Sequence, residues 1–114
     1  MIKFTILLRR RSGMSHDDFV AYHRDTHASL FMSVKAVKDN VRRYVQQHTV
    51  EVDLPGMPGP TFDGVTELWF DDVASIGAVF GDSEYLAVIR PDEARFCDMD
   101  GCEFLVTAEN VVSA

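Results

Sequence analysis

Apolar side chains follow two different spacings along the chain, and these spacings predict strands and helices in turn. A spacing of two residues is typical of half-buried strands, because alternate side chains of a strand point to opposite faces. The first segment, residues 2–8, is predicted to be a strand because it is rich in β-branched and aromatic residues and is bounded by charged residues and Gly13. The strands expected on this basis cover residues 2–8, 41–52, 65–70 and 103–111.

A helical spacing begins at Ser15, which is followed by the acids Asp17 and Asp18 in the pattern of a capped helix start. The next apolar and histidine side chains fall within a stripe about 120° wide, the width of a helix face that packs on a core. The members of this stripe are Phe19, Val20, His23, His27, Leu30, Phe31, Val34 and Val37. The pattern ends at residues 39–40.

A second helical region follows the third expected strand. Asp71 or Asp72 is expected to cap a helix that runs to Phe80, and Gly81 interrupts it. A further helical piece, over about residues 83–89, is expected to end at Pro91. Residues 54–64 contain three prolines and three glycines, so they are expected to form a loop.

The order strand, helix, strand, strand, helix, strand predicts one α+β domain over residues 1–114, with the ferredoxin-like βαββαβ topology. Both helices then cover one face of a four-stranded antiparallel sheet. The other face is expected to carry Tyr44, His48 and Trp69, a surface that a monomer rarely exposes. Two sheets placed face to face would cover it, which predicts a homodimeric α+β barrel. A ligand cavity is expected between sheet and helices or within the barrel.

Charge and composition exclude several classes of partner. The chain has 18 acidic and 11 basic side chains and a net charge of -7, which disfavours nucleic acid and anionic membranes. The apolar run from Phe4 to Leu8 is too short to span a bilayer and lacks a signal-peptide cleavage site, so we expect a cytoplasmic protein. Cys97 and Cys102 match neither a disulfide framework nor a zinc motif.

Four stretches carry a resemblance to a known family: IKFTILLRR, MSHDDFVAYHRDTHASL, GVTELWFDD and RFCDMDGCEFLVTAEN. Together they cover nearly the whole chain, which resembles the EthD-domain family of dimeric α+β barrel proteins. The most specific part is the helix pattern formed by Ser15, Phe19, Tyr22 and His27. The chain differs at His23, where relatives often carry tryptophan.

The resemblance implies a homodimer without cofactors, with a small and mostly apolar pocket that contains a few polar side chains. Relatives include small proteins of catabolic gene clusters and fungal dehydratases that act on polyketide anthrones. The wider superfamily includes cofactor-free monooxygenases, polyketide cyclases and haem-linked enzymes. Because one fold hosts many reactions, the resemblance does not identify the reaction.

Two histidines are candidates for catalysis on the first helix. His27 is the histidine of the family pattern and lies within the apolar stripe, where an imidazole could transfer a proton; alternatively it is a hydrogen-bonded core histidine. His23 lies one turn earlier on the same face and either relays protons or fills volume. A third possibility is that His23 and His27 bind a metal ion together with Glu67 or His48. Because the chain has no HExxH motif, we expect no metal.

Further candidates come from the strands. His48 and Tyr44 share one face of the second strand, where His48 is either a further acid or base or a solvated side chain. Glu67 and Trp69 share one face of the third strand, and Glu67 is either a base or paired with an arginine, Arg42 or Arg43. The residues expected to bind substrate are Tyr44, Trp69, Glu67 and Phe31, and those expected to act in catalysis are His27, His23 and His48.

These candidates favour a cofactor-independent enzyme that acts on a small aromatic or alicyclic carbonyl compound, such as a polyketide-like phenol or a catabolic lactone. Dehydratase, isomerase and oxygenase reactions of this kind all begin with proton removal beside a carbonyl, for which His27 is the expected base. The alternative is a non-catalytic protein that binds a small hydrophobic molecule, or an accessory protein of a catabolic oxidoreductase system.

Overall fold

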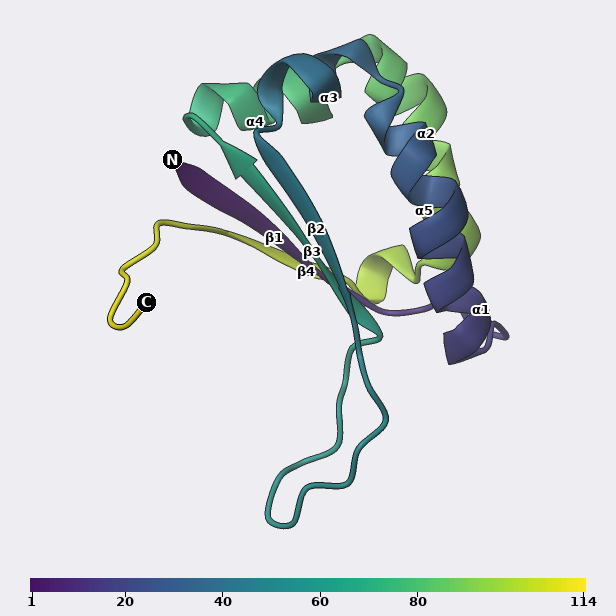
Figure 1. Ribbon diagram of the computed structural model, residues 1–114. Helices are drawn as coiled ribbons and strands as arrows, with labels where there is room; N and C mark the ends of the chain where they lie inside the picture. Colours follow the sequence, from purple (N-terminus) through teal and green to yellow (C-terminus); the bar gives the residue numbers. More distant parts are fainter.

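The computed structural model describes all residues 1–114, and a four-stranded antiparallel sheet forms its base (Figure 1). The strands are β1 (Ile2–Leu8), β2 (Arg43–His48), β3 (Gly64–Phe70) and β4 (Glu103–Thr107). They lie in the order β2-β3-β1-β4, and each neighbouring pair is antiparallel. With one helical crossover between β1 and β2 and another between β3 and β4, this order confirms the ferredoxin-like α+β fold.

β2 and β4 are shorter than their sequence patterns predict, because the neighbouring strand with which each one pairs has no further residues to pair with. β4 was expected to extend to residue 111, but Thr107 already pairs with Lys3 near the beginning of β1. In the same way, β2 ends at His48, which pairs with Gly64 at the first position of β3. A strand is stabilised by ladder hydrogen bonds to its neighbour, so residues without a partner leave the sheet.

The first crossover is a helical rod interrupted by a π-helix. Its segments are α1 (His16–Ala21), η1 (Tyr22–His27), α2 (Ala28–Met32) and, after a break, α3 (Lys35–Asn40). The Ser15 hydroxyl accepts a hydrogen bond from the Asp18 amide at 3.1 Å, which confirms the expected cap. The break lies at Val34, whose backbone is extended. π-helical turns are frequent at functional sites, and η1 carries both buried histidines, His23 and His27.

The second crossover continues further than its sequence predicts. It consists of α4 (Val73–Phe80), η2 (Tyr85–Ile89), α5 (Arg90–Phe96) and the short 3-10 turn η3 (Met99–Gly101). The expectation that the helix ends at Pro91 is wrong, because the helix runs on to Phe96. A proline lacks the amide proton and crowds the preceding turn of an α-helix. Here the preceding turn is the π-helical η2, so Pro91 lies in the first turn of α5, where prolines are tolerated.

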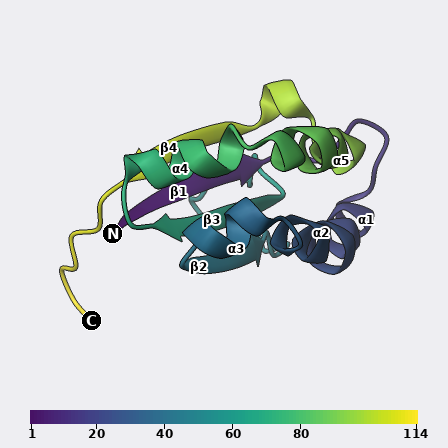
Figure 2. The ribbon, with the colours of Figure 1, turned by 90° about the horizontal axis from the view of Figure 1, so that it is seen from above.

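All of the helices cover one face of the sheet, and strand register decides which side chains they cover (Figures 1 and 2). Tyr44 pairs with Leu68, so both point toward the helices, whereas Arg43 pairs with Trp69 on the open face. The expectation that Tyr44 and His48 share a face with Trp69 is therefore wrong. Side chains alternate along a strand, so a pairing register offset by one residue transfers the whole set to the other face.

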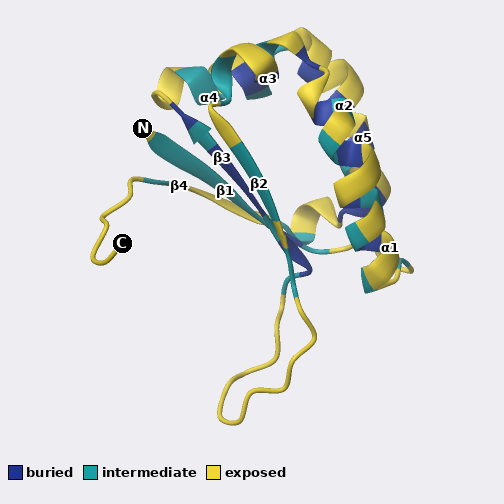
Figure 3. Cartoon of the chain, in the orientation of Figure 1, coloured by how far each residue is buried: buried dark blue, intermediate teal, exposed yellow.

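The core lies between the helices and the inner face of the sheet, as the burial pattern in Figure 3 shows. Its larger cluster comprises Phe31, Val34, Val37, Leu68, Phe70, Val79, Tyr85 and Ile89. A smaller cluster comprises Leu8, Phe19, Phe96 and Cys97. By contrast, residues 50–61 of the β2–β3 loop and the tail over 108–114 are exposed. None of the helices has both the length and the hydropathy needed to cross a membrane.

Phe70 tests how strongly this core stabilises the fold. Its side chain is fully buried at the end of β3 and belongs to the larger cluster. We expect Phe70→Ala to lower the free energy of unfolding by about 3–5 kcal/mol, because it removes buried apolar surface and leaves a cavity. Urea denaturation measures this loss. Val112→Ala is the control, since Val112 is 89% exposed and should change stability by less than about 0.5 kcal/mol.

Candidate active site

His27 and Asp92 form a buried pair that joins the two helical crossovers. His27 is the last residue of η1, and Asp92 lies in the first turn of α5. Nδ1 of His27 donates a hydrogen bond to Oδ2 of Asp92 at 2.8 Å, and the side chains are 9% and 1% exposed. Oδ1 of Asp92 accepts from the Tyr22 hydroxyl at 2.5 Å and from Arg95 at 3.1 Å. Both carboxylate oxygens therefore have donors, as a buried charge requires.

The protonation states of this pair follow from its surroundings. Burial alone would raise the pKa of Asp92, but the hydrogen bonds from Tyr22, His27 and Arg95 outweigh burial and hold the pKa below its ordinary value. Burial lowers the pKa of His27 below 6.5, and the hydrogen bond to Asp92 opposes only part of that effect. At neutral pH the pair is therefore a carboxylate and a neutral imidazole.

The second ring nitrogen of His27 has no hydrogen-bond partner in the protein. Because Asp92 accepts the proton on Nδ1, Nε2 carries the lone pair of the neutral ring. No protein group bonds to Nε2, and no buried polar side-chain atom lacks a partner, so Nε2 is accessible. His27 lines an internal cavity of about 60 Å³ between the sheet and the helices. The geometry is that of a base whose ring is held in position at the wall of a small cavity.

This internal cavity adjoins a larger apolar groove. The groove has a volume of about 380 Å³, which falls within the range of small-molecule sites. Its apolar lining includes Phe4, Ile76, Phe80 and Phe104, from β1, α4 and β4. The side chains common to the cavity and the groove are Ile6, Phe80, Glu93, Met99 and Cys102. A ligand in the groove can therefore extend a small group toward His27.

His23 is more deeply buried than His27 and has partners for both nitrogens. Its Nδ1 lies 3.0 Å from Nε2 of His48, and its Nε2 lies 3.2 Å from the Thr66 hydroxyl. Burial, with smaller effects from His27 and His48, lowers the pKa of His23 to about 3. The rings of His23 and His27 are 6.0 Å apart, and both contact Phe96. His23 thus joins the first crossover to β2 and β3 as a neutral hydrogen-bonding group.

Tyr44 and Phe31 complete the aromatic wall of the cavity. Their rings lie 5.3 Å apart, and both side chains line the cavity beside His27. The Tyr44 hydroxyl accepts a hydrogen bond from the Gln46 amide at 2.8 Å, so its own proton is available to a ligand. Burial raises the pKa of Tyr44 to about 12, which keeps it a neutral donor at physiological pH. The arrangement offers a base and a hydrogen-bond donor in one apolar enclosure.

Glu67 and Trp69 lie on the opposite face of the sheet from this cavity. Glu67 is paired with Lys3 and accepts a hydrogen bond from Gln47. The alternative that Glu67 pairs with an arginine is therefore wrong, because Lys3 reaches it from β1. Nε1 of Trp69 donates to Glu109 at 2.8 Å. The sheet separates Glu67 from the histidines, so it cannot complete a metal site with them.

No group of three or more His, Cys, Asp and Glu side chains in the chain is arranged to hold a metal ion. The cavity histidines do come close to one another: His48 lies beside His23, and their ring centroids are 5.1 Å apart. However, Nδ1 of His23 and Nε2 of His48 face each other at 3.0 Å, and Nδ1 of His27 is bonded to Asp92. These hydrogen bonds occupy the nitrogens that a shared ion would need.

Asp92 is the member of this candidate site that the sequence pattern did not reveal. It lies between Ile89 and Phe96 at helical spacing, so it occupies the buried face of the helix. An acid within an apolar stripe is a recognisable signal of a buried polar group. That signal was hidden because Pro91 predicted the end of the helix one residue earlier.

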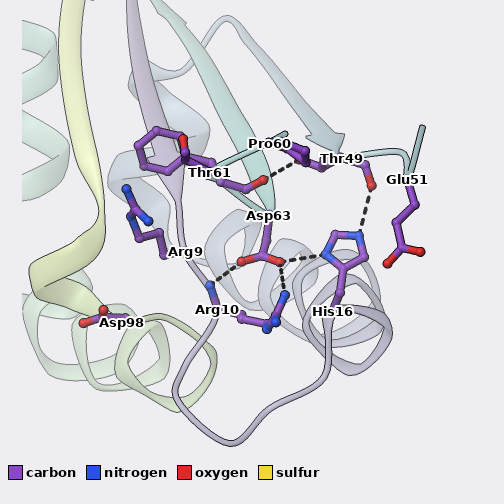
Figure 4. A pocket seen from close by; sticks show the side chains of 10 residues that line it. Arg9, Arg10, His16, Thr49, Glu51, Pro60, Thr61, Asp63 and Asp98 are labelled. Carbon is purple, nitrogen blue, oxygen red and sulfur yellow. Dashed lines mark hydrogen bonds and ion pairs between the residues drawn. The ribbon is translucent and has the colours of Figure 1, made fainter. Parts of the chain in front are cut away.

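A second cleft, of about 450 Å³, lies at the base of the β2–β3 loop (Figure 4). There, Nδ1 of His16 lies 2.8 Å from the Asp63 carboxylate, and Nε2 lies 3.0 Å from the Thr49 carbonyl oxygen. Both neighbours are acceptors, so both nitrogens donate and the ring is an imidazolium. The pKa of His16 is accordingly raised, chiefly by its hydrogen bond to Asp63.

Arg10 completes this cluster by donating twice to Asp63, from its backbone amide at 2.8 Å and from its guanidinium at 2.9 Å. The groups of the cluster thus satisfy one another, and neither nitrogen of His16 is free to act as a base. Their effect is to attach the beginning of α1 to both ends of the loop. The cluster is a structural latch, in contrast to the cavity around His27.

Comparisons with known proteins agree with this architecture. The family model for the EthD domain matches residues 11–100. A search of curated proteins finds no match.

Among solved structures, an EthD family protein from Bacillus halodurans is 19% identical, with a TM-score of 0.72, and the match covers 96% of this chain and 99% of that chain. An EthD-like protein from Ralstonia eutropha is 18% identical, with a TM-score of 0.66 and coverage of 98% and 92%. A dimeric ferredoxin-like protein of unknown function from Thermobifida fusca is 13% identical, with a TM-score of 0.64 and coverage of 95% and 90%. At these identities the likenesses show the fold.

The latch at His16 should make stability depend on pH. Because the pKa of His16 is raised above its ordinary value of 6.5, its contribution is complete below that value. The contribution is lost as the pH rises through the raised pKa of the folded state. We therefore expect the difference in free energy of unfolding between wild type and His16→Gln to shrink from pH 6 to 9, measured by urea denaturation.

His48→Gln is the matched control for this prediction. Burial lowers the pKa of His48, so its contribution is lost only as the pH falls below 6.5. The corresponding difference for His48→Gln should stay constant from pH 7 to 9. A constant difference for His16→Gln from pH 6 to 9 would contradict the imidazolium assignment.

Proposed function

We propose, from the premise that this chain belongs to the EthD domain family, that it is a cofactor-independent enzyme acting on a small aromatic or alicyclic carbonyl compound. Its chemical step would be removal of a proton beside the carbonyl group, with His27 as the base. The observation that carries the proposal is the orientation of His27, whose Nδ1 is held by buried Asp92 while Nε2 is free at the cavity. His23, by contrast, has protein partners for both ring nitrogens.

The proposed reaction assigns a role to each side chain around the cavity. The ring system of the substrate would lie in the apolar groove, and its carbonyl oxygen would accept a hydrogen bond from Tyr44. His27 Nε2 would take the proton from the adjacent carbon, and the Asp92 carboxylate would stabilise the imidazolium that forms. Phe31 would pack against the substrate, as the wall of the cavity suggests.

Electrostatic preorganisation supports this step. The Tyr44 hydroxyl and the buried Asp92 are held by hydrogen bonds before any substrate arrives, so little reorganisation accompanies proton transfer. The enolate that results could expel a hydroxide, accept a proton at another carbon or react with oxygen. Dehydratase, isomerase and oxygenase reactions therefore share this first step. His23 and His48 would support it by holding the first crossover against β2 and β3.

We also propose that the protein is a homodimer in which two sheets pack face to face. On β4, Leu105 supports this, since it pairs with Thr5 on the open face of the sheet and is 45% exposed. An edge strand with such exposure is rarely left uncovered in a monomer. The Thermobifida fusca protein of the same fold is dimeric. Trp69 and Glu67 would then lie at the interface or line the space between the sheets.

Deuterium exchange tests the role of His27. In D2O, the wild type should accelerate exchange of the protons beside the carbonyl in at least one member of a panel of aryl ketones and lactones, with α-tetralone as the reference probe. His27→Asn should reduce this acceleration by about 10²–10⁴-fold, because general base catalysis is lost. NMR measures the exchange. Thr26→Asn, at an exposed neighbouring position, is the matched control and should exchange like wild type.

The pH profile separates this mechanism from simple binding. The neutral form of His27 is the base and its pKa is below 6.5, so exchange should be constant above pH 7 and decrease at acidic pH. Asp92→Asn removes the carboxylate that raises the His27 pKa, so the acidic decrease should move to lower pH while the maximal rate falls. Undiminished exchange in His27→Asn would contradict the proposal. Binding of the probes without exchange in wild type would favour the non-catalytic alternative.

Light scattering tests the homodimer. We expect the wild type to have twice the chain mass of 12.8 kDa at micromolar concentration. Trp69→Glu should shift the mass toward that of one chain, because it places a charge in the proposed sheet-to-sheet interface. Leu86→Glu is the matched control, since Leu86 is 46% exposed on η2, among the helices. A wild type with the mass of one chain would contradict the homodimer.

A further inference from the structure

The two cysteines of the chain meet beside the end of β1. Cys97 follows α5 and forms an isolated antiparallel bridge with Arg10. Cys102 immediately precedes β4, and its Sγ accepts a hydrogen bond from the Arg9 amide at 3.4 Å. Because Arg9 and Arg10 are consecutive, the two cysteines approach the same short stretch of backbone. Both are free thiols.

The segment between the cysteines is shaped to bring them together. The Asp98 amide donates to the Arg9 carbonyl at 3.0 Å, and Nε of Arg9 donates to the Gly101 carbonyl at 2.8 Å. Residues 98–101 therefore turn outward while both ends remain attached to Arg9. The Asp98 and Arg9 side chains pack closely against this turn, since a Cβ at Gly101 would lie 2.6 Å from the Asp98 carboxylate and 2.7 Å from Cδ of Arg9.

The pair is reached from the groove. Cys97 and Cys102 both line the internal cavity, but only Cys102 also lines the adjoining groove. Cys97 is 5% exposed, and Cys102 is more exposed. A small molecule that enters the groove therefore meets Cys102 first, with Cys97 behind it.

The electrostatics of the pair divide its two thiols into different roles. A hydrogen bond from the Cys97 side chain lowers the pKa of Cys102, and the Arg9 amide adds to this effect. The same interaction, with burial, raises the pKa of Cys97. Since the thiolate is the reactive form, Cys102 is the better nucleophile and Cys97 is the thiol beside it.

We propose that Cys102 and Cys97 form a site of two-electron oxidation by small hydroperoxides that enter the groove. The Cys102 thiolate attacks a peroxide oxygen, the O–O bond breaks, and the alcohol or water leaves with a proton, which produces a sulfenic acid on Cys102. The Cys97 sulfur then attacks the Cys102 sulfur, the S–O bond breaks, and water leaves with the Cys97 proton. The sulfurs lose two electrons in forming the disulfide, and the peroxide gains two.

This proposal does not depend on the proposed proton transfer. It predicts that oxidation joins residues 97 and 102 within one chain and removes the Cys102 thiol from the wall shared by the cavity and the groove. The hydrogen bonds from Asp98 and to Gly101 attach both ends of the segment between the cysteines to Arg9, so the disulfide would close a short loop whose ends are already fixed to one residue.

Mass spectrometry of the reduced protein treated with stoichiometric peroxide tests the site. Trypsin cleaves after Arg95 and leaves both cysteines in one peptide, residues 96–114. We expect this peptide to lose the mass of two hydrogens, and the loss to be reversed by dithiothreitol. The protein is treated separately with cumene hydroperoxide, an apolar probe, and with hydrogen peroxide, the polar comparison. We expect both peroxides to produce this mass loss. Oxidation of Met99 would add oxygen mass and is thereby distinguished.

Single variants separate the two roles. Cys97→Ser should accumulate a sulfenic acid at Cys102 that dimedone traps, whereas Cys102→Ser should lose at least about tenfold in oxidation rate, because the thiolate-rich sulfur is gone. Circular dichroism confirms that each variant folds, and the mass shift in wild type provides a test without substitution. Two thiols that persist after peroxide treatment, or a disulfide between chains, would overturn the proposal. A dimedone adduct at Cys97 in Cys102→Ser that forms at the wild-type rate would overturn it as well.

Discussion

The buried carboxylate of Asp92 is the constraint on which the rest of the structure depends. A charge removed from water is tolerated only when its oxygens receive hydrogen bonds or ion pairs. Asp92 is 1% exposed, and its donors come from two places: Tyr22 and His27 on the first crossover and Arg95 on its own helix. The two crossovers can therefore pack only in the arrangement that brings these donors to Asp92. Packing of Phe96 against Phe19 and Tyr22 supports the same arrangement with apolar contacts.

The same pair gives the site its chemical character. A buried histidine without a carboxylate would be neutral, with its proton on either nitrogen. Asp92 assigns the proton to Nδ1 and leaves the lone pair on Nε2, where the cavity begins. His23, one turn away, shows the opposite outcome, since both of its nitrogens have protein partners. The difference between a structural histidine and an available base is thus a difference in hydrogen-bond partners.

The two faces of the sheet serve different purposes. The inner face combines the core with the cavity and is closed by the helices (Figures 2 and 3). The outer face carries Trp69 with Arg43 at 4.7 Å and Lys3 at 5.4 Å from its ring centroid. Tryptophan and arginine are both enriched at protein interfaces, whereas lysine is depleted there. The observed cavity thus lies on the helix side of the sheet, whereas the interior of the proposed barrel would lie on the other side.

Local pattern was sufficient for the elements and the family of folds. The β-branched and aromatic content of residues 2–8, the cap at Ser15 and the stripe that includes His27 all depend on neighbours within a few positions. The sequence alone therefore determined them, and with them the βαββαβ order. Tertiary structure decided the rest. His27 and Asp92 are 65 positions apart, and no periodicity within one helix relates them. The face of Tyr44 likewise follows from its register with Leu68, and the meeting of Cys97 with Cys102 from the path of the chain around Arg9. Secondary structure arises from interactions between near neighbours, whereas a site forms where distant segments satisfy each other's buried polar groups.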